Sequence, residues 1–376
     1  MASTLMLLAN PYRPDPRVRI EAKALADAGH KVTLLAWSRD TGEPGTDADG
    51  AVGISRVGPA CPFRSASRML TRLPRYWLAA LKASRAMTFD IVHSHDLDTL
   101  PAGLLIGRLR RKPVLYDAHE LYAAMVKDDV GAMSGPLQRL ESFLVRRADA
   151  VITVSDTLAD ELSKGRGQRA RVVMTSPDAS PLSEAEVRAV REERGLSGFV
   201  VSYLGSLEPG RFVEQLLDAF SPEDGVTVLV AGKGSLEEKV RQASGKGHVR
   251  YLGSVSTDEA LRLTAASDIV TAMMDPSNPN NVVGTPGKIL NSMALARPYV
   301  TTQGLRIAEL TERKGMGIVT SYDQGAFREA VLKARRDPRG LLEMGLRGRE
   351  HFASDMSWSK SKGELLEAYD SLVGAR

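Results

Sequence analysis

The chain has 376 residues, 43% of them hydrophobic and 26% charged, a composition typical of a folded globular protein with room for two domains. Its net charge of +4 is too small to indicate nucleic-acid binding, and its single cysteine, Cys61, excludes an internal disulfide framework and a cysteine-based zinc site. The first apolar run, residues 5–9, is too short for a signal peptide or a membrane span, so we expect a cytoplasmic protein.

Short apolar strands alternate with amphipathic helices from the beginning of the chain. Such alternation predicts a parallel sheet with helices on both faces. A polar segment with three glycines, residues 41–50, is interpreted as a loop. The expected strands are 5–9, 32–37, 54–57, 91–93, 114–116, 150–154 and 172–174, and the expected helices are 18–28, 100–109 and 136–147.

Residues 64–87 form a basic amphipathic segment that we expect to be broken near Pro74. Its cations, which interleave with apolar residues, are Arg64, Arg68, Arg72, Arg75, Lys82 and Arg85. One interpretation is a helix packed on the sheet with its basic face in water. The other is a patch that rests on an anionic membrane surface, which would place the protein peripherally at the inner face of a membrane.

The strand and helix pattern starts again at Phe199, after a charged segment at 181–198 that we interpret as a linker. Strands are expected at 200–204, 226–230, 249–252, 269–271 and 299–301, and a closing helix at 360–372. The sequence therefore predicts an α/β protein of two Rossmann-like, doubly wound parallel-sheet domains. We expect the first at 1–180, the second at 199–357, and a closing helix within 358–376 that crosses back to the first.

Ligands of such sheets bind outside the carboxyl ends of the strands, and polar residues gather at these positions in the first half. They are Asp15, Arg17, His95, Asp96, Asp117, His119 and Glu120. His93 and His95 are two positions apart, so their side chains would point to the same face of the sheet if the strand continued through both. We interpret His93 as a core histidine and His95 as functional, whereas Asp117 could instead cap a helix. The spacing of His95, Asp96 and Asp98 is too unspecific for a metal site, and we expect none.

In the second half, glycines and cations follow the strands. They are Gly205, Arg211, Gly232 and Lys233, and then Pro286, Gly287 and Lys288 at the start of a helix. A helix N-terminus with a lysine suits a diphosphate, because free backbone N–H groups and positive charge meet there. The alternative is an ordinary capped helix.

Several stretches, taken together and in this order, resemble the retaining glycosyltransferases of family four. They include DPRVRIEAKALADAGHKVTLLAW, FDIVHSHDLDTLPAGLL, VLYDAHELY, VVSYLGSL, VLVAGKGSLEEKV, TPGKILNSMALARPYV and MSWSKSKGELLEAYDSLV. The resemblance implies a GT-B fold, in which two Rossmann-like domains face a central cleft. It implies transfer of a sugar from a nucleoside-diphosphate sugar, such as a UDP- or GDP-sugar, to an acceptor hydroxyl with retention. No metal or other cofactor is required in this family.

The resemblance also assigns roles to residues. His95 matches the histidine near the reacting sugar, and Arg211 with Lys288 matches the cations that hold the diphosphate. The catalytic candidates are His95, Glu120 and Asp15; the donor-binding candidates are Gly205, Arg211, Gly232, Lys233, Pro286, Gly287, Lys288 and Asn291; the acceptor-binding candidates are Arg17, Asp96 and His119. A carbohydrate or lipid-linked acceptor of envelope polysaccharide, lipopolysaccharide or glycolipid synthesis is expected.

The sequence departs from the family pattern at three positions. Ser206 stands where the family has arginine, Asn291 stands where it has the second of two paired glutamates, and no acid occurs near Val283 for the first. An amide oxygen accepts hydrogen bonds more weakly than a carboxylate. A binding or scaffold protein that keeps the fold without catalysis is therefore the alternative, and an epimerase of similar fold is a third possibility.

Overall fold

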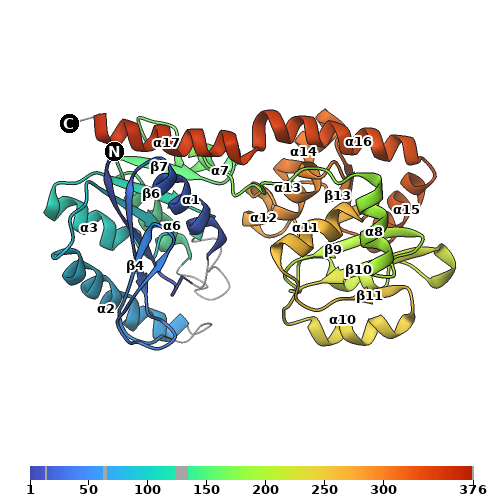
Figure 1. Ribbon diagram of the computed structural model, residues 1–376, viewed down its shortest axis with the longest axis horizontal. Helices are drawn as coiled ribbons and strands as arrows, with labels where there is room; N and C mark the ends of the chain where they lie inside the picture. Colours follow the sequence, from blue (N-terminus) through green and yellow to red (C-terminus); the bar gives the residue numbers. More distant parts are fainter. Residues whose placement is uncertain (13–14, 62–65, 123–133, 375–376) are drawn as a thin grey trace. The chain divides into compact units, whose positions relative to one another are not determined.

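The computed structural model describes residues 1–12, 15–61, 66–122 and 134–374. The chain forms two compact units, Met1–Thr175 with Ser361–Arg376, and Ser176–Lys360. Each unit is built on one sheet with helices on both of its faces (Figure 1). The predicted fold class, two doubly wound α/β domains, is confirmed.

The first unit contains an eight-stranded sheet of order β3-β4-β2-β1-β5-β6-β7-β8. Its strands are β1 Ser3–Leu8, β2 Lys31–Trp37, β3 Gly45–Asp49, β4 Val52–Val57, β5 Ile91–His95, β6 Val114–Ala118, β7 Ala150–Thr153 and β8 Arg171–Val172. All neighbouring strands pair in parallel except β3 and β4.

Strand β3 corrects the prediction that residues 41–50 form a loop. Gly45–Asp49 pairs antiparallel with β4 at the edge of the sheet. The strand is almost wholly exposed and carries no large apolar side chain, so the alternation that reveals a half-buried strand is missing from its sequence. Backbone pairing at the edge, and not burial, forms this strand.

The helices of the first unit begin and end close to the predicted positions, except α7 (Asp156–Leu162), which was not predicted. They are α1 Pro16–Asp27, α2 Ala66–Ser84, α3 Leu100–Arg110, α6 Ser134–Val145, α7 Asp156–Leu162 and, from Ser361 onward, α17 Trp358–Gly374. Asp15 caps α1, because its carboxylate accepts from the N–H groups of Arg17 and Val18. Gly29, at φ +85°, follows the end of this helix, as the sequence predicted.

Helix α2 runs through Pro74 without a break, which corrects the prediction of an interruption there. Pro74 lies on the exposed side, whereas Tyr76 and Ala80 are buried against the sheet. Tyr76 stacks on Trp37 of β2 with 5.1 Å between ring centroids, and its hydroxyl donates to the carbonyls of Leu8 and Leu35. This packing outweighs the lost backbone hydrogen bond of the proline. Of the basic segment, Arg64 lies outside the described residues.

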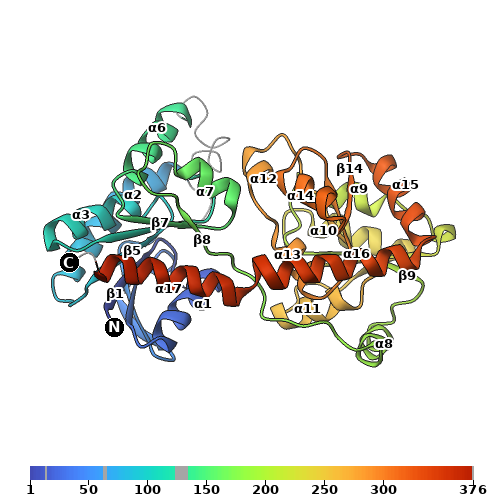
Figure 2. The same ribbon diagram turned by 90° about the horizontal axis from the view of Figure 1, so that it is seen from above.

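The closing helix α17 lies beside α1 and β1 of the first unit (Figure 2). Leu365, Tyr369 and Leu372 are its buried residues on this unit. Arg171 at the edge of the sheet pairs with Glu364 of the helix at 2.9 Å.

The second unit contains a six-stranded sheet of order β11-β10-β9-β12-β13-β14, parallel throughout. Its strands are β9 Phe199–Leu204, β10 Val226–Ala231, β11 Val249–Tyr251, β12 Ile269–Ala272, β13 Tyr299–Thr302 and β14 Ile318–Thr320. Side chains alternate between its two faces: Val201 and Tyr203 pack into one core cluster, and Val200 and Leu204 pack into another.

Helices cover both faces of the second sheet. They are α8 Glu184–Glu193, α9 Val213–Leu217, α10 Glu237–Ala243, α11 Thr257–Ala265, α12 Pro279–Val283, α13 Gly287–Ala294, α14 Arg306–Lys314, α15 Gln324–Arg335 and α16 Pro338–His351. The segment 181–198, predicted as a linker, contains α8, and Val190 of this helix packs with Val200 and Leu263 of the second unit. Among the described residues, no helix has both the length and the apolar character that crossing a membrane requires.

Candidate active site

The strand orders of both sheets place their candidate residues where the direction of chain winding reverses. In the first sheet this switch point lies between β1 and β5, and in the second between β9 and β12. Loops diverge there and leave space outside the carboxyl ends of the strands, which is where ligands of open α/β sheets bind. Asp15 and Arg17 follow β1, and His95 ends β5.

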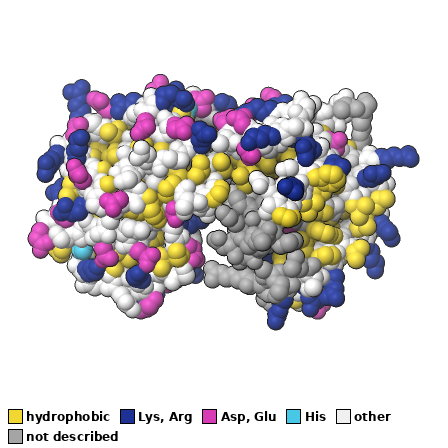
Figure 3. All heavy atoms as spheres, turned by 180° about the vertical axis from the view of Figure 1, so that it is seen from behind, with side chains coloured by type: hydrophobic (Ala, Val, Ile, Leu, Met, Phe, Trp, Pro, Cys, Tyr) yellow, Lys and Arg dark blue, Asp and Glu magenta, His cyan; other side chains and the backbone are white. Residues whose placement is uncertain are grey.

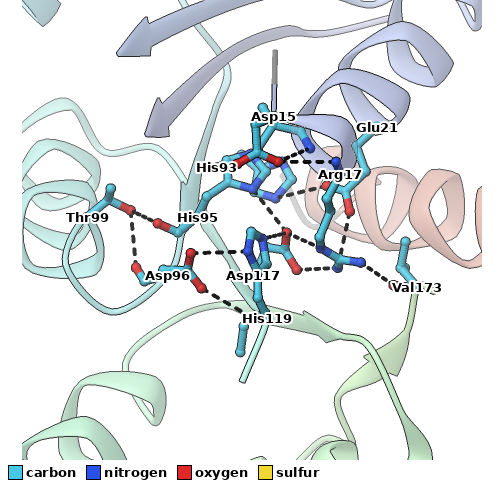
Figure 4. Close-up of polar contacts among 12 residues, drawn as sticks. Asp15, Arg17, Glu21, His93, His95, Asp96, Thr99, Asp117, His119 and Val173 are labelled. Carbon is cyan, nitrogen blue, oxygen red and sulfur yellow. Dashed lines mark hydrogen bonds and ion pairs between the residues drawn. The ribbon is translucent and has the colours of Figure 1, made fainter. Parts of the chain in front are cut away.

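Asp117, at the end of β6, is the centre of a buried polar cluster in the first unit (Figure 4). Its Oδ2 accepts from Arg17 Nε at 2.9 Å and His119 Nε2 at 2.9 Å and lies 3.0 Å from His95 Nδ1. Arg17 Nη2 donates to its Oδ1. Burial opposes the charge of Asp117, but Arg17 and His119 outweigh it and hold the pKa of this carboxyl well below its usual range. Asp117 therefore does not cap a helix, which was the alternative interpretation of its sequence position.

His119 and Asp96 form the more accessible part of this cluster. His119 Nδ1 lies 3.1 Å from Asp96 Oδ2, and the exposed fractions of the two side chains are 21% and 33%. Burial opposes the positive charge of His119, but Asp96 and Asp117 raise the pKa of the imidazole well above its usual value. Asp96 has a left-handed backbone, φ +60°, which is uncommon outside glycine and clusters at functional sites. Both N–H groups of this imidazole are engaged by carboxylates, so the ring fixes the Asp96 carboxylate, which can accept from a polar ligand.

His93 and His95 face the same way, as their spacing predicted: their rings stack with centroids 4.2 Å apart. Both are fully buried. His93 Nδ1 lies 2.9 Å from the hydroxyl of Tyr369 on α17. Burial and then the neighbouring His95 lower the pKa of His93 well below its usual value, so this imidazole is neutral.

The structure brings together Arg17, His95, Asp96 and His119 of the predicted site residues. Asp15 lies at the edge of this cluster, where it caps α1 and accepts from Asn10 Nδ2 at 3.1 Å. Glu120 is half-buried one position beyond His119.

Sequence reasoning missed two members of the cluster, Glu21 and Tyr369. Glu21 Oε1 forms an ion pair with Arg17 Nη2 at 3.1 Å, and burial raises the pKa of Glu21 to about 7 despite Arg17. One signal for Glu21 was present: it stands three residues after Val18 and four before Leu25, on the apolar side of α1. Tyr369 gave no such signal, because its partner lies in a distant part of the sequence.

In the second unit, backbone bonds join the loops that follow β9 and β10. Leu207 N–H donates to Lys233 O and Leu236 N–H to Leu207 O. Gly232, at φ +147°, approaches Gly205 so closely that a Cβ atom would lie 1.8 Å from the Gly205 carbonyl oxygen. Gly205, at φ +152°, has Lys288 Nζ as its neighbour, 3.3 Å from the position of a Cβ. Glycines are required here because the two backbones and the lysine occupy the space of side chains.

Lys288, on the first turn of α13, lies with its Nζ 4.2 Å from the centre of the Tyr203 ring. Burial, and then the charge of Arg211, lower its pKa to about 7. Among the described residues, neither Lys288 nor Arg211 pairs with a carboxylate. Arg211 precedes Phe212, a buried residue with φ +62° whose strained backbone is fixed by the surrounding core. Two cations close together without an anion form a site that suits a bound anion.

The remaining donor-binding candidates lie on α13, near Lys288, or on the loop that follows β10. Pro286 and Gly287 are the N-cap and first residue of α13, and Asn291 is half-buried one turn further along this helix. Lys233 is exposed between the two close-packed glycines of the β10 loop.

Comparison with known proteins gives two family matches. Residues 14–178 match the model described as "Glycosyl transferase 4-like domain", and residues 198–337 match "Glycosyl transferases group 1". The chain is 24% identical to the glycogen synthase of Mycobacterium tuberculosis (strain ATCC 25618 / H37Rv), over 92% of this chain and 88% of that protein.

Solved structures share the fold of the whole chain. Sucrose-phosphate synthase from Thermosynechococcus elongatus aligns with a TM-score of 0.80 at 17% identity, over 100% of both chains. Anabaena Alr3699/HepE in complex with UDP-glucose aligns with a TM-score of 0.74 at 16% identity, over 99% of this chain and 100% of that chain.

Proposed function

This chain belongs to the family of glycosyl transferases group 1, with a glycosyl transferase 4-like first domain, and from that premise we propose how it acts. It takes a sugar from a nucleoside-diphosphate sugar and passes it, with retention at the anomeric carbon, to an acceptor hydroxyl. In our proposal the second unit holds a UDP- or GDP-sugar and the first unit holds a carbohydrate or lipid-linked acceptor.

The observation that supports this proposal most directly is a pair of cations in the second unit, Lys288 and Arg211, for which the described residues provide no carboxylate partner. Lys288 and Arg211 lie close enough for the charge of Arg211 to lower the pKa of Lys288. A departing nucleoside diphosphate carries negative charge on its leaving oxygen, and fixed cations stabilise that charge more in the transition state than in the substrate. The N–H groups at the start of α13, at Gly287 and Lys288, would add to this stabilisation.

In the first unit we assign acceptor binding to His119 and Asp96, and catalytic roles to Asp15 and Glu120. Arg17, an acceptor-binding candidate from the sequence, is buried and pairs with Asp117 and Glu21, so we assign it a positioning role. The side chains of His119 and Asp96 are partly exposed, and the Asp96 carboxylate, held by His119, can accept a hydrogen bond from a sugar hydroxyl. His95 is fully buried, so we assign it a positioning role: with Arg17, it holds Asp117, which in turn orients the ring of His119.

The alternative is a binding protein without catalysis, and Ser206 and Asn291 favour it. Calorimetry with UDP and GDP, followed by incubation with a panel of UDP- and GDP-sugars, separates the two proposals. Binding of a diphosphate and turnover of one sugar nucleotide are expected. Binding without any turnover would support the alternative, and no binding at millimolar nucleotide would contradict the assigned donor site.

We expect nucleotide binding to be coupled to protonation of Lys288. Above a pKa of about 7 the free amine is mostly neutral, whereas a bound diphosphate favours the ammonium. Binding at about pH 8 should therefore take up a proton, and affinity should fall by up to roughly tenfold per unit as the pH rises above 7. Calorimetry in two buffers of different ionisation enthalpy measures the proton uptake.

The matched control is Lys288→Arg, because a guanidinium stays charged throughout this range. The variant should bind UDP or GDP without proton uptake. A wild-type binding enthalpy that does not depend on the buffer would contradict the coupling.

We also propose that the acceptor is membrane-associated, as in envelope polysaccharide, lipopolysaccharide or glycolipid synthesis. On one face of the first unit, hydrophobic side chains and Lys or Arg side chains lie together (Figure 3). On α2, the exposed Leu78 stands between Arg75 and Lys82 at helical spacing. The exposed apolar side chains of the neighbouring helices are Leu105 and Leu109 of α3 and Leu140 and Phe143 of α6. Apolar residues ringed by cations are typical of a surface that rests on anionic lipid.

Flotation with vesicles tests this proposal. Wild-type protein should bind vesicles that contain anionic phospholipid, and the triple reversal Arg68→Glu, Arg72→Glu, Arg75→Glu should abolish binding, since each cation near the surface contributes about 1 kcal/mol. Reversal of three exposed cations in the second unit, Lys239, Arg241 and Lys246, changes the net charge equally and should leave binding intact. Equal loss in both variants would indicate a net-charge effect and contradict a defined surface.

A further inference from the structure

Three fully buried side chains of the first unit, Glu21, His93 and His95, have polar atoms without a hydrogen-bond partner in the described part of the chain. These atoms are both carboxylate oxygens of Glu21 and the Nε2 atoms of His93 and His95. Buried polar atoms are nearly always satisfied, because leaving one unpaired costs about 1–3 kcal/mol. Glu21 Oε1 has an ion-pair partner in Arg17, so three of these atoms, Glu21 Oε2 and the two Nε2 atoms, are left for another ligand.

These residues converge on one region between α1 and β5. One ligand atom from each of these three residues, with one from Asp117, lies within 4.8 Å of the others. Glu21 Oε2 and His93 Nε2 are 3.9 Å apart. This is too long for a hydrogen bond, but it is close to the separation of about 3.3 Å between two ligands of a tetrahedral zinc ion. Figure 4 shows Glu21, His93 and His95 around the centre of the cluster.

The Nδ1 atoms of His93 and His95 each lie beside a hydrogen-bond acceptor, as the second ring nitrogen of a metal-binding histidine does. His95 Nδ1 lies 3.0 Å from Asp117, a carboxylate paired with Arg17, so Nδ1 is the donor in this contact and Nε2 is left as the nitrogen that can bind a metal. His93 Nδ1 lies 2.9 Å from the Tyr369 hydroxyl, which can accept in the same manner. Metal-bound histidines almost always donate their second N–H to such a partner, which fixes the tautomer.

The charges around this point also suit a cation. The acidic side chains here are Glu21, Asp96 and Asp117, and they outnumber the one guanidinium, Arg17, and the one imidazole, His119, that contact them. Arg17 Nη2 lies by Oε1 of Glu21, so Oε2, on the side of His93, is not engaged by the guanidinium.

We propose that Glu21, His93 and His95 bind one divalent transition-metal ion of the zinc class, through the Glu21 carboxylate and the two Nε2 atoms. The proposal departs from the sequence expectation that no metal is bound. Two histidines and a carboxylate form a common zinc ligand set. Because the site is fully buried, the ion has a structural role: it ties α1 to β5 beneath Asp117 and takes no part in sugar transfer.

The test uses the full chain without an affinity tag. After expression in medium supplemented with zinc and removal of loose metal by gel filtration, elemental analysis should find about one zinc ion per chain. After chelation, titration with Co²⁺ should produce the visible absorption of a tetrahedral cobalt site. Adding Zn²⁺ to the chelated protein should raise its midpoint of thermal unfolding, since a ligand that binds only the folded state stabilises it.

Two variants and a control locate the site. Glu21→Gln and His93→Gln should lose the zinc and the cobalt spectrum, whereas His248→Gln, at a histidine of the second unit, should keep both. The opposing explanation is that Glu21 is protonated and shares its proton within the cluster. In that case the wild-type protein contains no metal, binds no Co²⁺, and is as stable as Glu21→Gln, and this result overturns the proposal.

The wild-type measurements decide the question even if a variant fails to fold. Metal content and the cobalt spectrum do not depend on nucleotide binding, so their failure is distinguishable from a failure of the proposed glycosyltransferase function.

Discussion

Replacing Lys288 with alanine is expected to lower kcat/KM for the sugar nucleotide by roughly 10²–10³-fold, the usual effect of removing one group that stabilises charge in the transition state. The physical reason is that Lys288 is a cation without a carboxylate partner among the described residues, beside Arg211 and at the start of α13. Initial rates with the donor found active in the nucleotide-sugar panel measure the effect.

Lys239→Ala is the matched control, because this lysine of the same unit pairs with Glu214 on the surface. Its kcat/KM should equal that of the wild-type protein. If Lys288→Ala were as active as Lys239→Ala, the assignment of the diphosphate site would be wrong.

Replacing Arg17 with methionine is expected to destabilise the first unit by about 3–5 kcal/mol, the cost of leaving a buried charge without its partner. Arg17 is buried and pairs with both Asp117 and Glu21. It also donates to the carbonyl of Val173 at 2.6 Å, beyond the end of β8. Denaturant unfolding followed by tryptophan fluorescence measures the loss, since Trp37 and Trp77 lie in the first unit.

The control lies two residues away on the same helix. Arg19 pairs with Asp49 at 2.8 Å, but its side chain is 56% exposed, so Arg19→Met should leave the stability almost unchanged. Similar losses in the two variants would show that the buried ion pairs of Arg17 do not stabilise the unit as proposed.

Much of the fold could be predicted from the sequence because its signals are local. Apolar runs of three to six residues, separated by amphipathic helices, indicated most strands of both sheets, and the carboxyl ends of these strands indicated His95, Asp96, His119 and Lys288. The prediction was wrong for β3 and for the break at Pro74, and it missed β14. An edge strand without apolar residues lacks the periodic signal, and the packing of Tyr76 keeps α2 continuous through the proline.

The sequence by itself determined that the chain folds as two α/β domains and that a lysine begins the helix after the fourth strand of the second. These features follow from hydrophobic periodicity and helix-end chemistry, which act between residues close in the chain. Only the tertiary structure decided that Asp117 is the centre of the polar cluster and that Glu21 and Tyr369 belong to it. Glu21 and Tyr369 come from the first and last helices, and they reach His93 because β5 lies next to β1 in the sheet. The order of strands depends on how two whole faces of the sheet are buried, and no short stretch of sequence specifies it.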